Sequence, residues 1–311
     1  MSIVETKKQP EQVWAGQGYR IAPNKEHHRL YKIELEEWVV EQFLEDVKDI
    51  SDEQLEYIPY QRQMVAKALQ DLLDESFGET IRHILHDRSS GGFTVGLQGK
   101  TADPQDYVKF STAFSHLAGI PNFDAMSKKY YARFSVKHTD DSDSYLRQAY
   151  RRFTLHTDGT YVDEPTDWLL MMKMEEENAV GGSSRLLHLD DWEDFDYFSK
   201  HPLASYPFTY KAPASKNVSE EVTRKTFYTW NNLPCICFID QFVYPETIDQ
   251  AGYLQELSHS MEESKSVIEL ELPVGDLVML NNRFWLHGRG AFEKNTDLHR
   301  ELLRQRGHFV Q

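Results

Sequence analysis

Two patterns of hydrophobic and polar residues divide the chain near Pro121. Before it, apolar residues recur at steps of three and four, which predicts amphipathic helices over most of residues 30–88. A strand at Phe93–Leu97 and a further helix at Asp106–Leu117 follow. Each helix has one apolar stripe, so we expect these helices to pack against another surface.

After Pro121 the apolar residues occur in short runs rich in β-branched and aromatic side chains. Only two helices, Trp192–Ser199 and Glu246–Ser264, are predicted in this half. Many strands with few crossover helices favour two packed antiparallel sheets. We therefore predict an α+β, mainly β fold, with a jelly-roll core buttressed by the N-terminal helices. The predicted strands are Tyr130–Val136, Arg152–His156, Trp168–Met174, Arg185–Leu189, Phe208–Tyr210, Thr226–Trp230, Cys235–Phe242, Val267–Leu272, Asp276–Asn281 and Leu302–Val310.

The domain organisation follows from the same pattern. Residues 1–25 are polar and lack a clear period, so we expect a flexible arm there, followed by a single domain over residues 26–311. No apolar stretch approaches the roughly 18 to 20 residues that a membrane span requires. The two cysteines, Cys235 and Cys237, share an apolar run and are expected to be buried fillers in a reducing cytoplasm.

The charge of the chain argues against nucleic-acid binding. The chain has 34 Lys and Arg against 50 Asp and Glu, a formal net charge of −16. A nucleic-acid-binding protein needs a basic face to offset phosphate charge, and this chain has no long basic run.

Three residues have the spacing of a metal site. His156 and Asp158 are two apart in an extended segment, so both side chains leave the sheet on one side. His287 follows an apolar strand far along the chain. Two histidines and one carboxylate form the site of non-haem iron(II) oxygenases, which leaves positions open for cosubstrate and oxygen. The alternative is a histidine beside a solvated acid.

An arginine cluster follows His287. Arg300, Arg304 and Arg306 have even separations, so on an extended strand all three share a face. In an acidic protein such a face suggests a pocket for carboxylates, which guanidinium groups bind bidentately. The alternative is surface ion pairing with Glu293, Asp297 or Glu301.

With these residues in view, the sequence resembles the iron(II)- and 2-oxoglutarate-dependent oxygenases of the taurine dioxygenase superfamily. From about residue 30 to the C-terminus it is similar to one group of them, the glutarate 2-hydroxylase (CsiD) family. The blocks that carry this resemblance are 122–127, 130–134, 141–148, 158–162, 187–192, 215–219, 239–242 and 304–307.

The resemblance implies a double-stranded β-helix, a cytoplasmic homotetramer and hydroxylation of glutarate at C2 in lysine degradation. One 2-oxoglutarate is converted to succinate and CO2, with Fe(II) held by His156, Asp158 and His287 and with O2 as the oxidant. In the superfamily an arginine somewhat over ten residues after the distal histidine binds the far carboxylate of 2-oxoglutarate, assisted by a hydroxyl from a Gly-Gly turn. Arg300 and Ser184 match these positions, although Ser184 could equally cap its loop. Arg304 and Arg306 are then left for the substrate.

Other interpretations stay open. The iron chemistry could act on another short dicarboxylate, the site could belong to a non-catalytic metal-binding β-barrel protein, and zinc accepts the same ligands in a hydrolase. A halogenase is disfavoured because Asp158 occupies the position where chloride would need space. We expect structural roles for the tyrosine pair 130–131 and for four histidines without partners at ligand spacing, His83, His86, His188 and His201.

Overall fold

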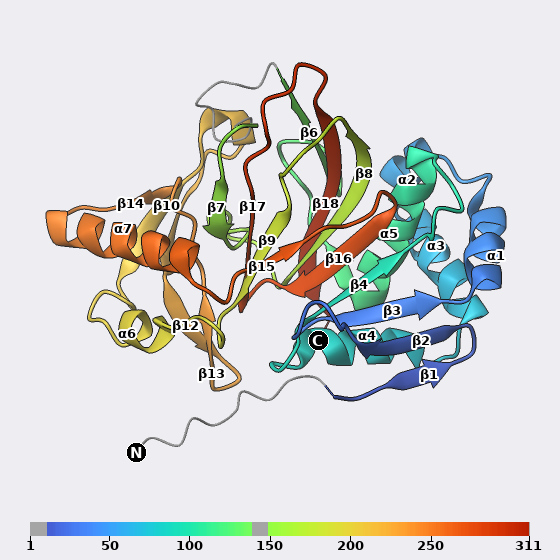
Figure 1. Cartoon of the computed structure of the whole chain (residues 1–311), viewed down its shortest axis with the longest axis horizontal. Helices are drawn as coiled ribbons and strands as arrows, with labels where there is room; N and C mark the ends of the chain where they lie inside the picture. Colours follow the sequence, from blue (N-terminus) through green and yellow to red (C-terminus); the bar gives the residue numbers. More distant parts are fainter. Residues whose placement is uncertain (1–10, 139–148, 311) are drawn as a thin grey trace.

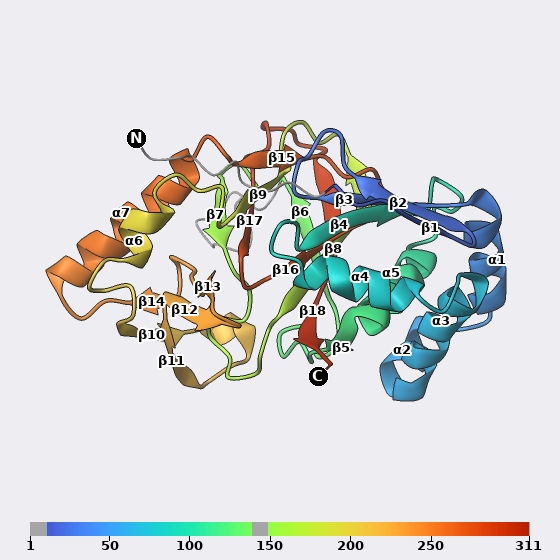
Figure 2. The ribbon, with the colours of Figure 1, turned by 90° about the horizontal axis from the view of Figure 1, so that it is seen from below.

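The computed structural model describes residues 11–138 and 149–310, so the sequence block 141–148 lies outside the described residues. Two largely antiparallel sheets face each other at its centre, with helices on the outer side of each (Figures 1 and 2). This arrangement, with more strand than helix, confirms the predicted α+β, mainly β fold.

The large sheet forms one wall of the core. Its strands run in the order β1-β2-β3-β4-β16-β8-β18, with two short strands, β5 and β6, both paired with β18. Their bounds are β1 Trp14–Gly16, β2 Tyr19–Pro23, β3 Tyr31–Leu35, β4 Gly92–Gly96, β5 Gly119–Pro121, β6 Ala132–Lys137, β8 Trp168–Glu177, β16 Asp276–Asn281 and β18 His299–Phe309.

The small sheet forms the opposite wall, with the order β15-β9-β17-β7. Beyond it lie two helices, a single 3-10 turn (η1) and two minor sheets made of β10–β14. The small-sheet strands are β7 Phe153–His156, β9 Ser184–His188, β15 Ile268–Leu270 and β17 Trp285–Arg289. The surrounding elements are α6 Phe195–Ser199, β10 Pro207–Lys211, η1 Ala214–Lys216, β11 Glu221–Lys225, β12 Phe227–Trp230, β13 Leu233–Ile236, β14 Val243–Tyr244 and α7 Ile248–Glu263.

The N-terminal helices cover the outer face of the large sheet. Figure 2 shows α4 and α5 directly against it, while α3 packs on α5 and on the two shorter helices before it. This confirms the predicted helical buttress. The bounds are α1 Glu37–Val47, α2 Asp52–Tyr57, α3 Pro59–Leu72, α4 Phe77–His86 and α5 Pro104–Ala118.

Strand β8 separates two hydrophobic cores because its successive side chains point to opposite faces. Leu170 and Met172 pack with the helices on the outer face, whereas Leu169 and Met171 pack between the two sheets. Since both faces are buried, β8 appears in the sequence as an unbroken apolar run. The same alternation in β18 directs Arg300, Leu302 and Arg304 toward the space between the sheets.

Two expectations for the N-terminal region are wrong. Residues 14–23, assigned to a flexible arm, form β1 and β2 of the large sheet, where Tyr19 and Ile21 are buried and Arg20 is exposed. The helical region starts only at Glu37, because Tyr31–Leu35 has strictly alternating buried and exposed side chains and forms β3. Period-two alternation over five residues is too short to stand out beside a long helical pattern.

Two further differences concern strands near the site. The predicted strand Cys235–Phe242 is regular only as far as Ile236, and the five-residue strand β17 was not predicted. Strand β17 is defined by partners on both sides, β7 and β9, which the local sequence does not reveal. None of the helices in the described part of the chain is long and apolar enough to cross a membrane.

We expect the aromatic contacts beneath the large sheet to dominate its attachment to the helices. Phe114 of α5 is fully buried, with ring centroids of Phe77, Phe93 and Phe110 at 6.1, 6.0 and 5.0 Å. Phe114→Ala should lower the free energy of unfolding by about 3 to 5 kcal/mol in denaturant titrations. Ile248→Ala, at a side chain that is 90% exposed, should change it by less than about 0.5 kcal/mol. Equal effects of the two changes would show that this cluster does not anchor the helices.

Candidate metal centre and active site

Two neighbouring strands of the small sheet bring two histidines together. His156 ends β7 and pairs directly with His287 of β17, and the centroids of their imidazole rings are 4.1 Å apart. The Nδ1 atom of His156 lies 2.7 Å from the carbonyl oxygen of Thr154. Because a carbonyl oxygen accepts the hydrogen bond that Nδ1 donates, the Nε2 atom is left free of the proton and can bind a metal. Gly288 permits the close approach, because a Cβ atom there would lie 2.5 Å from the carbonyl oxygen of Phe153.

Asp158 joins the histidines from the turn after β7. Its backbone N–H donates to Oδ1 of Asn282 over 2.9 Å, and Nδ2 of Asn282 donates to the carbonyl oxygens of Asp158 and Thr166 over 3.0 and 2.9 Å. A buried amide therefore holds the main chain of Asp158 from both sides. The carboxylate lies 4.0 Å from Nε2 of His156.

These three residues fit a metal ion. One ligand atom from each lies within 4.8 Å of the other two, and Nδ1 of His287 has no hydrogen-bond partner in the described structure. Burial lowers the pKa of His156, and it lowers that of His287 to about 3, with His156 acting in the same direction. Both imidazoles are therefore neutral at pH 7, the form that binds metals.

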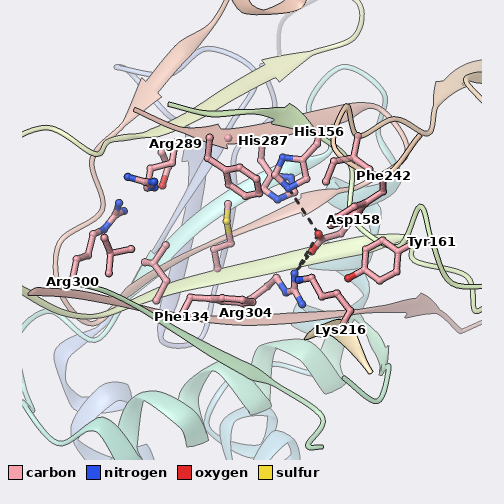
Figure 3. Close-up of a pocket in the computed structure, with 17 residues that line it drawn as sticks. Phe134, His156, Asp158, Tyr161, Lys216, Phe242, His287, Arg289, Arg300 and Arg304 are labelled. Atoms are coloured by element: carbon pink, nitrogen blue, oxygen red, sulfur yellow. Dashed lines mark hydrogen bonds and ion pairs between the residues drawn. The ribbon is translucent and has the colours of Figure 1, made fainter. Parts of the chain in front are cut away.

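The carboxylate of Asp158 stays ionised because of Arg304. Burial alone would raise the pKa of Asp158, but Arg304, followed by His287, holds it well below its usual value. Nη1 of Arg304 lies 3.2 Å from Oδ2 of Asp158 (Figure 3). Nη2 of Arg304 donates to Oδ2 of Asp124 over 2.7 Å. The guanidinium thus connects the candidate metal ligand to a second buried acid.

Of the other predicted arginines, one lines the pocket and one lies behind it. Arg300 is 3% exposed, donates to the carbonyl oxygen of Gly182 and lies 3.5 Å from a carboxylate oxygen of Glu176. Ser184, at the start of β9, lines the same pocket. Arg306 is buried on the same strand but does not line it, and its Nε and Nη1 atoms have no hydrogen bonds to described residues.

Figure 3 shows a pocket with two cationic ends. Arg289 and Arg300 lie at one end, and Arg304 and Lys216 lie toward the other, where Asp158 connects Arg304 to His156. Burial lowers the pKa of Arg289 to about 10, with Arg300 adding to the effect, so its guanidinium remains charged at pH 7. Apolar side chains, including Phe134, complete the walls.

Sequence reasoning missed four residues of this site: Asp124, Lys216, Asn282 and Arg289. Arg289 is two residues after His287, so alternation along β17 could have indicated it. The others come from separate segments, and only folding brings them to the site.

The remaining histidines have structural surroundings. His188 accepts a hydrogen bond from the backbone of Asp190, and burial lowers its pKa to about 3. Within the described ranges, the predicted structural histidines His83, His86, His188 and His201 belong to no group of three potential metal ligands. A second group, Glu175, His299 and Glu301, is an ion-pair network in which Glu301 accepts from Arg133.

The tyrosine pair and the cysteines are also structural. Tyr130 and Tyr131 are both buried, with their rings in edge contact. Both cysteines are free, and burial raises the pKa of Cys237 to about 12. A thiol with so high a pKa is inert at neutral pH.

The fold is similar to that of solved non-haem iron oxygenases. Asparagine oxygenase in complex with Fe(II), a hydroxyasparagine and succinate matches with a TM-score of 0.71 and 14% identity, over 87% of this chain and 90% of that chain. The non-haem iron oxygenase OrfP in complex with Fe and α-ketoglutaric acid matches with a TM-score of 0.62 and 15% identity, over 86% and 90%. At such low identity the similarity establishes the fold alone.

The family assignment has separate support. The model of the CsiD family matches residues 19–309, which is nearly the whole chain. That range contains both sheets apart from β1, the three candidate metal ligands and all four arginines of the site. The chain therefore belongs to the CsiD family.

Proposed function

We propose that this protein hydroxylates glutarate at C2 to give 2-hydroxyglutarate. In the same reaction, O2 and one 2-oxoglutarate are consumed and succinate and CO2 leave. The broader class, an iron(II)- and 2-oxoglutarate-dependent oxygenase, rests on membership of the CsiD family, on the shared fold and on His156, Asp158 and His287. OrfP has been solved with Fe and α-ketoglutaric acid, and asparagine oxygenase with Fe(II) and succinate.

The charge of the pocket is the observation that best supports dicarboxylate substrates. Among the described residues that line it, Lys216, Arg289, Arg300 and Arg304 are cationic, and Asp158 is the one acidic residue. In a chain of net charge −16, this concentration of cationic side chains around one pocket favours anionic ligands. Two dicarboxylates bound side by side would supply them.

The proposed roles follow the positions of the side chains. His156, Asp158 and His287 would hold iron(II), which when bound supplies the oxygen activation that couples decarboxylation to hydroxylation. Arg300 and Ser184 would bind the far carboxylate of 2-oxoglutarate at one end. Arg304 would orient glutarate at the other end, with Arg306 adding positive charge from behind. The apolar walls would exclude water from the reacting carbon.

The biological setting is part of the proposal. A role in lysine degradation, a cytoplasmic location and a homotetrameric assembly are what the glutarate 2-hydroxylase resemblance implies. The substrate is a small molecule, so the acidic surface is not required to bind nucleic acid or membrane.

Anaerobic reconstitution with iron(II) tests the reaction directly. Succinate formation from 2-oxoglutarate would be measured after oxygen is admitted, across a panel of dicarboxylates, with mass spectrometry of the hydroxylated product. Glutarate should give the highest rate. A higher rate with another short dicarboxylate would keep the reaction class and replace the substrate, and no succinate with any compound would favour a non-catalytic metal-binding protein.

Removal of any one metal ligand should abolish turnover. His156→Ala, Asp158→Ala, Asp158→Gly and His287→Ala should each lower activity by more than about 100-fold and reduce bound iron, because a three-ligand site loses its geometry. Circular dichroism should show an intact fold. His83→Ala changes an exposed histidine on α4 and should retain wild-type iron content and rate. A ligand variant with normal activity would remove that residue from the metal centre.

Arg300→Ala should raise KM for 2-oxoglutarate by about 30-fold or more, because one partner of a buried charge pair is lost. KM for glutarate should change much less. Arg20→Ala, at a side chain that is 60% exposed, is the matched control. Steady-state kinetics with each compound varied in turn would measure both KM values. A selective rise in KM for glutarate would show that the two ends of the pocket have been assigned the wrong way round.

Arg304→Ala and Arg306→Ala should instead raise KM for glutarate by a similar factor, while succinate formation in the absence of glutarate continues. Arg304→Ala should also change iron affinity, since the ion pair that positions the carboxylate of Asp158 is lost. Arg306 has no direct contact with Asp158 among those the structure records, so Arg306→Ala should leave iron content unchanged. Unchanged kinetics for glutarate in both variants would place the substrate pocket elsewhere.

A further inference from the structure

Lys216 lies in the pocket on the opposite side from Arg289 and Arg300 (Figure 3). It is the last residue of η1, is 4% exposed and lines the cavity together with the three candidate metal ligands. It is the one lysine among the described residues that line the pocket.

The backbone holds Lys216 firmly at this place. Its N–H donates to the carbonyl oxygen of Pro213 over 2.9 Å, and Asn217 follows in the left-handed conformation with φ of 54°. The amide of Asn217 donates to the carbonyl oxygen of Ala125 over 3.3 Å. The turn is therefore tied to the segment that also carries Asp124, the acidic partner of Arg304.

The surroundings of the ammonium group are aromatic and cationic. Its nitrogen lies 5.9 Å from the centroid of the Tyr161 ring and 6.0 Å from that of Phe134, whose ring also faces the guanidinium of Arg304 at 4.8 Å. Two cationic side chains thus share one aromatic wall. A dicarboxylate lying along this wall would interact with both.

The electrostatics favour an anion here. Burial lowers the pKa of Lys216 to about 7, with Arg304 and Arg306 acting in the same direction and Asp158 and Asp124 opposing them. The carboxylate of Asp158 is already shared between Arg304 and the proposed metal. A ligand carboxylate would favour the charged ammonium and offset the repulsion between the cations.

We propose that Lys216 binds a carboxylate of the prime substrate and thereby restricts the enzyme to dicarboxylates. A dicarboxylate could contact Arg304 with the carboxylate beside the reacting carbon and Lys216 with the other. A monocarboxylate would lose the interaction with one of these two side chains, so it should bind more weakly. This inference rests on the proposed function, because it assigns the substrate end of the same site.

The competing explanation is that Lys216 has only a packing role. The four-carbon stem of a lysine can pack against Tyr161 and Phe134 and support the wall without binding substrate. Lys216→Met separates the two, since methionine keeps an unbranched apolar chain and removes only the charge. Lys216→Arg keeps a cation. Lys109→Met is the matched control, because Lys109 is also buried, at 2% exposure, but lies on α5 and does not line the pocket.

The experiment measures kinetics with glutarate and with pentanoate, which lacks one carboxylate. Wild type should strongly prefer glutarate. Lys216→Met should raise KM for glutarate by about 30-fold or more, leave KM for 2-oxoglutarate and succinate formation without substrate nearly unchanged, and reduce the preference for glutarate over pentanoate by a similar factor. Lys216→Arg should recover part of the loss, and Lys109→Met should behave as wild type.

Calorimetric titration of glutarate into protein loaded with iron(II) and 2-oxoglutarate, without oxygen, provides a readout independent of turnover. Binding should weaken in Lys216→Met by the same factor as KM rises. Unchanged glutarate binding and an unchanged preference for glutarate over pentanoate in a folded Lys216→Met protein would overturn the inference and show that Lys216 has only a packing role. Absence of glutarate turnover in wild type would instead overturn the proposed function, so the two failures are distinct.

Discussion

Antiparallel pairing of β7 with β17 is the constraint on which the candidate site depends. It places His156 opposite His287 and is possible only where Gly288 lets the backbones approach. Strand β7 has four residues, and Glu262 of α7 braces it by accepting from the backbone of Leu155 over 2.5 Å. The histidines therefore stand on strands, which hold ligand geometry more precisely than loops. The third candidate ligand, Asp158, lies beyond β7 and needs Asn282 to hold its main chain.

The second constraint is electrostatic. A chain of charge −16 repels dianions at a distance, so the field near the metal centre has to be reversed locally. Lys216, Arg289, Arg300 and Arg304 together supply positive charge there, and Arg304 is not an isolated buried charge because Asp124 and Asp158 both contact it. Although burial alone would lower the pKa of Arg304, these two acids raise it. The apolar wall strengthens each of these interactions by excluding water.

Sequence patterns predict those parts of the site that local periodicity determines. The spacing of two suggests that His156 and Asp158 act together, although Asp158 reaches the site from the turn after β7 and not by strand alternation, and Arg300 and Arg304 share a face through their even separation. The pattern could not predict that Arg306, on the same face, lies behind the pocket, since that depends on how β18 crosses the opposite wall. Lys216 and Asn282 belong to separate turns with no signal of their own. The same limit explains β17, whose five residues are defined by partners distant in sequence.

Strand β18 connects the two proposed halves of the reaction. Its inward side chains include Arg300 at the 2-oxoglutarate end and Arg304 beside Asp158, with Leu302 between them. Four residues of an antiparallel strand extend about 13 Å, long enough for two five-carbon diacids to occupy different ends of one pocket. Leu302 keeps the two guanidiniums apart, so each can bind its own carboxylate. Under the proposed roles, one strand sets both the distance between the two ligands and the separation of like charges. Its outward residue Leu303 packs in the core formed with the N-terminal helices.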